Sequence, residues 1–172
     1  MKRYCTLLTW RASARGRLVR RLKESRGANI VELALTLPLL FLLTFSIVDF
    51  GSLFYVYLAL ENGVSQATRY AVTGNQMDDP DNPGEQLGRA DSIKAAMRDA
   101  TPTLTIDDAA FSFSHMAPGG AWVSGTGGPS DIEKVTVTYT WTPFTPVIRP
   151  FFENGELTLR VESAMKNEGR FN

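Results

Sequence analysis

The longest run of hydrophobic residues in the chain covers residues 30–48. Glu32 is its only charged residue. As an α-helix this run would be about 28 Å long, which matches the hydrocarbon core of a bilayer. The pattern predicts that the chain crosses a membrane once, with residues 28–50 as the transmembrane segment.

The apolar pattern continues past Asp49 with a changed period. A carboxylate is costly at mid-bilayer but much less so near the headgroups, so Asp49 is the expected exit from the lipid. Apolar residues then recur at spacings of four and three, which predicts an amphipathic helix. This stripe consists of Leu53, Tyr57, Leu60, Val64, Ala67 and Ala71. With Gly74 as C-cap, one continuous helix from about Ala28 to Thr73 is predicted.

A second helix is predicted after a polar loop. Asn82, Pro83 and Glu85 have the spacing of an N-cap, a first-turn proline and a capping glutamate. Residues 87–100 continue with helical periodicity, and Thr101-Pro102 ends the helix. The side chains expected to face solvent are those of Arg89, Asp91, Lys94 and Arg98.

From residue 111 onwards the period changes to two. Alternating segments at 111–115, 135–141 and 157–161 predict strands, and Asn154-Gly155 is a hairpin signal before the last of them. The predicted fold class is therefore α+β, with a long N-terminal transmembrane helix, a second helix and an antiparallel sheet of three or four strands. The apolar face of the sheet is expected to pack on the helical stripe.

Charge divides the chain at residue 27. Residues 1–27 contain nine Lys or Arg and one acid, whereas the remainder contains nine basic and seventeen acidic residues, so the two parts carry +8 and −8. The basic end predicts a cytoplasmic leader (1–27) before the transmembrane helix (28–50) and an extracytoplasmic domain (51–172). An acidic domain argues against a nucleic-acid partner.

A secretory signal peptide is the alternative explanation of the N-terminal region. Its apolar core would usually be 7 to 15 residues long, and no small-x-small cleavage site follows Val48. A retained single-pass anchor is therefore favoured. Cys5, the only cysteine, falls in the leader, so the domain is expected to be stabilised by packing without disulfides.

Chemical motifs indicate neither catalysis nor a cofactor. His115 is the only histidine, which excludes multi-histidine metal sites, and it is expected in the sheet. The acidic loop 78–85 resembles a calcium loop, but Pro83 and Ala90 replace two ligands. The Gly-rich segment 118–129 lacks a P-loop lysine and is expected to be a flexible connection. No metal, cofactor or enzymatic activity is predicted.

The segment 142–152 is unusually apolar for a loop. Its three prolines exclude a central strand. Its bulky side chains either cover the end of the sheet or form a contact patch for a partner or a membrane surface. These residues are Phe144, Val147, Ile148, Phe151 and Phe152.

Residues 26–74 carry a recognisable combination of motifs. Arg26-Gly27 is followed by ANIVELALTLPLL, an aromatic-rich helix exit and ALENGVSQATRYAVTG, and the chain closes with LTLRVESAMKNE. This combination resembles the TadE-like family, minor pseudopilins of the tight-adherence pilus system. The resemblance implies a pilin-like domain on a protein of the bacterial inner membrane, and hetero-oligomeric assembly with other pilus subunits. It also implies cleavage by a prepilin-type peptidase.

The resemblance assigns roles to four residues of the helix. Cleavage would follow Gly27 and leave Ala28 as the new N-terminus, with Glu32 as the assembly glutamate. A neighbouring subunit's free amine would neutralise this carboxylate; alternatively, Glu32 lies at the cytoplasmic interface, stabilised by the helix N-terminus and water. Pro38 matches a family proline and would kink the helix, with or without a function.

The sequence thus favours a non-catalytic pseudopilin-like protein that supports adhesion and surface colonisation. The alternative is a membrane-tethered enzyme or ligand-binding module whose helix is only an anchor.

Overall fold

The computed structural model describes the backbone of residues 12–171 and the side chains of residues 27–171. Cys5 and the first part of the predicted leader lie outside the described residues. The chain divides into two compact units, Met1–Ile47 and Val48–Asn172. Helix α1 (Ala12–Thr73) contributes to both units.

Within the first unit, the apolar side chains of α1 face outwards. The side chains of Leu35 and Leu39, for example, are 73% and 68% exposed. Among the described residues, one helix, Gly27–Thr73, is long and apolar enough to cross a membrane, and its most apolar stretch is not buried. Such exposure is expected of a segment whose solvent is lipid.

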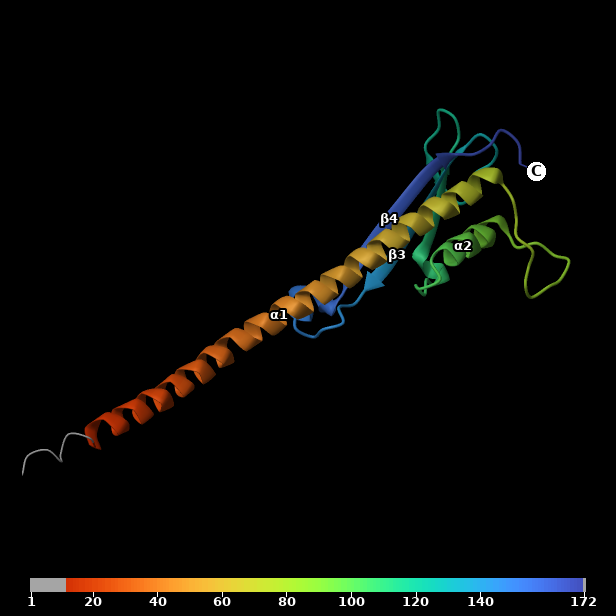
Figure 1. Ribbon diagram of the computed structural model, residues 1–172. Helices are drawn as coiled ribbons and strands as arrows, with labels where there is room; N and C mark the ends of the chain where they lie inside the picture. Colours follow the sequence, from red (N-terminus) through yellow and green to blue (C-terminus); the bar gives the residue numbers. More distant parts are fainter. Residues whose placement is uncertain (1–11, 172) are drawn as a thin grey trace, which may run out of the picture. The chain divides into compact units, whose positions relative to one another are not determined.

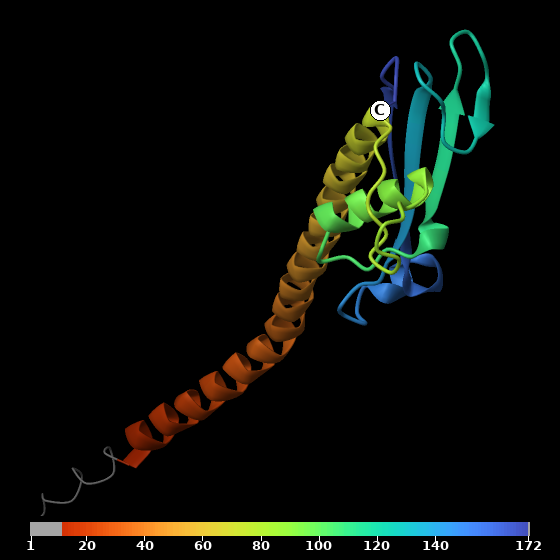
Figure 2. The same ribbon diagram turned by 90° about the vertical axis from the view of Figure 1, so that its right-hand side faces the viewer.

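The second unit is an α+β domain, as predicted. Its sheet has the order β2-β1-β3-β4, and every neighbouring pair is antiparallel. The strands are β1 (Phe111–Met116), β2 (Trp122–Ser124), β3 (Ile132–Trp141) and β4 (Leu157–Lys166). Figures 1 and 2 show α2 (Arg89–Ala100) and the C-terminal part of α1 against the same face of this sheet. Short 3-10 turns occur at Asp108–Ala110, Arg149–Phe151 and Glu153–Gly155.

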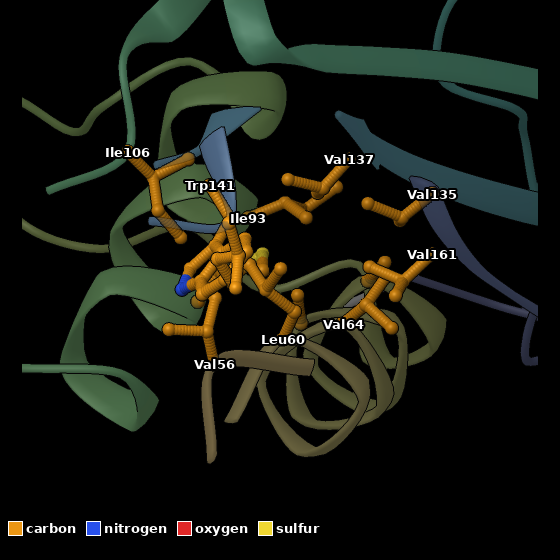
Figure 3. Close-up of a cluster of buried hydrophobic side chains, with 13 residues drawn as sticks. Val56, Leu60, Val64, Ile93, Ile106, Val135, Val137, Trp141 and Val161 are labelled. Atoms are coloured by element: carbon orange, nitrogen blue, oxygen red, sulfur yellow. The ribbon is translucent and has the colours of Figure 1, made fainter. Parts of the chain in front are cut away.

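The core forms where the stripe of α1 meets the sheet (Figure 3). Leu60, Val64 and Ala67 are fully buried against strand residues such as Val135 and Val137. The prediction of Tyr57 as a stripe member is wrong, because Val56 takes the buried position. Because a helix has 3.6 residues per turn, the residue that precedes Leu60 on the buried face can lie either three or four positions before it. Here it lies four positions before, and the exposed Tyr57 side chain donates its hydroxyl to Glu61 at 3.0 Å.

The end of α1 at Thr73 is as predicted, and Gly74 is needed there for two reasons. Its φ of +70° lies in the left-handed region that suits glycine. An added Cβ would also lie 2.2 Å from the ring of Phe171, a residue almost 100 positions later in the sequence.

The predicted start of α2 at Asn82 is wrong, since the helix begins at Arg89. The Asn82 side chain donates to the Asp79 carboxylate at 2.8 Å instead of capping a helix. The same carboxylate accepts from the N–H of Asp81 at 2.9 Å. These local bonds close a turn that competes with helix formation.

Two predictions about turns are also corrected. Asn154-Gly155 lies in a 3-10 turn and does not form the hairpin loop, because pairing of Trp141 with Leu157 places the whole of 142–156 between β3 and β4. The Gly-rich segment is not simply a flexible connection, since Trp122–Ser124 pairs with β1 as an edge strand. His115 lies in β1, as predicted, with its Nδ1 3.0 Å from the carbonyl oxygen of Gly125.

Candidate functional site

Gly27, Ala28 and Glu32 lie on α1, with Glu32 about one helical turn after Ala28. The Glu32 side chain is exposed. No atom lies within 4 Å of a Cβ built on Gly27. The predicted cleavage site and the predicted assembly glutamate are therefore both open to another molecule.

Three hydroxyl groups of the predicted membrane segment are bonded within the helix. Thr36, Thr44 and Ser46 donate to backbone carbonyls one turn earlier, at 3.0, 2.8 and 2.7 Å. Such bonds remove the cost of placing hydroxyl groups in lipid. Helix α1 continues through Pro38, which lacks the N–H that would bond the carbonyl of Ala34.

Asp49 binds a loop distant in sequence. It is fully buried, and one carboxylate oxygen accepts the N–H groups of Phe144 and Thr145 at 2.8 and 3.2 Å. The Thr145 hydroxyl donates to the other oxygen. The sequence predicts Asp49 only as the exit from the lipid, because nothing near Asp49 or Thr145 in the sequence indicates that the two residues meet.

The proline loop (residues 142–152) is fixed at this end of the domain. The Arg149 guanidinium donates to the carbonyl of Pro143 at 3.2 and 3.1 Å. Ile148 is buried, and the ring of Phe152 packs edge-on against Trp141. Phe144 and Phe151, however, are 73% and 83% exposed, and Val147 is also exposed. Some side chains of the loop thus cover the core, as one of the two expectations had it, whereas others face outwards.

Residues 27–69 match the TadE family, described as TadE-like protein. The match confirms the resemblance to TadE-like proteins over this segment. No curated protein and no solved structure gives a significant match to the chain.

A buried ion pair lies against the C-terminal end of α1, beyond the TadE-like segment. Arg89 donates to the carbonyls of Ala71 and Gly127, and lies 3.3 Å from Glu133 Oε2. The ring of Phe171 covers its guanidinium. Arg89 was expected to face solvent, which is wrong, because the first residue of α2 points at carbonyls from α1 and from the loop before β3.

Glu133 is fully enclosed in this cluster. Its Oε2 accepts the N–H of Gly127 at 2.7 Å, whereas Glu133 Oε1 and Asn167 Oδ1 have no partner among the described residues. Burial raises the pKa of Glu133, although the Gly127 N–H and Arg89 oppose the rise. Burial likewise lowers the pKa of Arg89. The cluster of Arg89 and Glu133 joins the C-terminal end of α1 to the sheet.

In the acidic loop after α1, the Asp79 carboxylate is bonded within the loop. The hydrogen bond from Asn82 is the main reason that the pKa of Asp79 is lowered, and the backbone of Asp81 adds to it. Among the residues with described side chains, no group of three His, Cys, Asp or Glu is placed to hold a metal ion. The geometry of this loop is that of a closed turn.

Proposed function

We propose that the protein is a non-catalytic, pseudopilin-like component of tight-adherence (Flp-type) pilus assembly in the bacterial inner membrane, supporting adhesion and surface colonisation. The observation that carries this proposal is that the TadE-like match falls on an outward-facing apolar helix. In this proposal residues 1–27 are a cytoplasmic leader, 28–50 cross the membrane, and 51–172 form the extracytoplasmic domain.

Glu32 is the proposed assembly residue. A lone carboxylate in an apolar segment is unfavourable in lipid unless a cation neutralises it, and a neighbouring pilus subunit's free amine would do so. Partners would therefore be other subunits of a hetero-oligomeric assembly. A membrane-tethered enzyme or binding module would not need this charge.

Neutralising Glu32 tests the proposal. In cells carrying Glu32→Gln, we expect piliation and surface attachment to be lost while the domain keeps its trypsin resistance. Glu61→Gln is the matched control, since it neutralises another carboxylate of α1 beyond the apolar run and should leave piliation intact. Normal piliation with Glu32→Gln would refute the assembly role and favour a tethered module.

Processing after Gly27 is tested separately. We expect the intact mass of the membrane-extracted protein to correspond to a chain beginning at Ala28, and Gly27→Leu to restore the full-length mass. Gly51→Leu is the control, because a Cβ at Gly51 also meets no atom within 4 Å. A wild-type species beginning at Met1 would refute cleavage.

A further inference from the structure

The most exposed large hydrophobic side chain among the described residues belongs to Phe151, and Phe144 is close behind. Both lie in the proline loop. Exposed aromatic side chains of this size are costly in water, so a pair of them on one loop indicates a contact surface.

This exposure is not the result of a loose loop. Asp49 holds the backbone at Phe144 and Thr145, and Arg149 binds the carbonyl of Pro143. Buried Ile148 and the packing of Phe152 on Trp141 fix the other half. The loop therefore presents its apolar side chains in a set position, which reduces the entropy lost on binding.

The attachment point indicates what the loop contacts. Asp49 directly follows Val48, where the predicted membrane-spanning run ends. On the same part of α1, Phe50 and Phe54 are exposed as well. Figures 1 and 2 show the loop beside α1 at one end of the sheet. Hydrogen bonds to Asp49 thus hold the loop at the residue where the chain is expected to leave the hydrocarbon, and aromatic side chains are favoured at this interface.

We propose that the proline loop is an interfacial membrane anchor that inserts Phe144, Val147 and Phe151 among the lipid headgroups. The proposal rests on the proposed membrane span but not on a pilus function. Because Glu153 and Glu156 follow the loop and Arg149 is its only cation, insertion is driven by apolar contact and needs no anionic lipid.

The test uses the full-length protein with Cys5→Ser, reconstituted into phosphatidylcholine vesicles. Single cysteines replacing Phe151 or Phe144 carry an environment-sensitive fluorophore. We expect severalfold weaker quenching by aqueous iodide, and stronger quenching by lipids with a nitroxide near the headgroup, than for Val123→Cys on the exposed edge strand β2. Added anionic lipid or salt should change neither result.

Two further outcomes would refute the loop anchor while leaving the membrane span itself intact. Leu39→Cys reports on the span itself; if its label is quenched by lipid while those at Phe144 and Phe151 match Val123→Cys, the span is supported and the anchor is refuted. If the loop labels are shielded from iodide and from lipid quenchers and quench one another, a second copy of the chain covers the loop. That result would also overturn the proposal.

Discussion

The buried carboxylate of Asp49 accepts the backbone N–H of Phe144 at 2.8 Å, joining α1 to a loop 95 residues later in the chain. The next N–H, of Thr145, reaches the same oxygen. A buried donor that loses its partner costs about 1–3 kcal/mol. This contact is therefore a main determinant of how the proline loop is held.

Replacing Asp49 should lower the stability of the domain substantially, because several groups of the proline loop depend on this one carboxylate. We expect Asp49→Ala to lower the free energy of unfolding by about 2–4 kcal/mol, because it leaves two N–H groups and a hydroxyl unpaired. Urea unfolding of the detergent-solubilised protein, followed by tryptophan fluorescence, measures this. Ser52→Ala removes only a hydroxyl donated to the Asp49 carbonyl and is the control. A loss equal to that of Ser52→Ala would contradict the role of the carboxylate.

The stripe of α1 gives a matched pair of leucines. Leu60 is fully buried in the core, whereas Leu58 is 58% exposed. Leu60→Ala should lower the free energy of unfolding by about 2–5 kcal/mol through the cavity it leaves, and Leu58→Ala by less than about 1 kcal/mol. The same unfolding assay compares the two. Similar losses would mean that the stripe does not face the core.

Local patterns in the sequence were sufficient to predict most of the fold. The apolar run, the stripe ending near Ala71, Gly74 and the alternating strands each depend on neighbours within a few residues, so periodicity reveals them. The match to the TadE-like family likewise falls on one contiguous segment, residues 27–69. The α+β class followed because these local signals agree with one another.

The contacts of the candidate site could not be predicted in this way. Asp49 and Thr145, or Arg89 and Glu133, are brought together only by folding, and neither partner indicates the other in the sequence. Asn82 and Asn154 gave strong local signals that were wrong, because nearby groups and the β3–β4 register determined those turns. The exposure of Phe151 beside the buried Ile148 also depends on the folded loop.

Gly74 combines two constraints that a pair of variants separates. Gly74→Ala should destabilise the domain both through its positive φ and through contact with Phe171, whereas Gly84→Ala has φ +99° but open surroundings. We expect Gly84→Ala to cost about 1–2 kcal/mol and Gly74→Ala clearly more. Adding Phe171→Gly to Gly74→Ala should recover the steric part, because the Cβ of Phe171 would itself lie 2.7 Å from the added methyl group. If the two single variants lose the same stability, Phe171 does not constrain this turn.

The buried carboxyl of Glu133 predicts a pH dependence of stability. Because burial raises its pKa in the folded state, the folded protein binds this proton more tightly than the unfolded chain. The stabilising contribution is full below the ordinary glutamate pKa and is lost as pH rises through the higher, folded value. The Gln side chain of Glu133→Gln cannot titrate. When the stabilities of wild type and this variant are compared at each pH, the contributions of the other titratable groups therefore largely cancel.

We therefore expect the wild-type Tm minus the Glu133→Gln Tm to decrease as pH rises from the ordinary glutamate range towards neutrality. Thermal unfolding of the detergent-solubilised proteins across this range measures the difference. A Glu133→Gln difference that increased with pH would show that Arg89 and the Gly127 N–H outweigh burial and depress the pKa of Glu133.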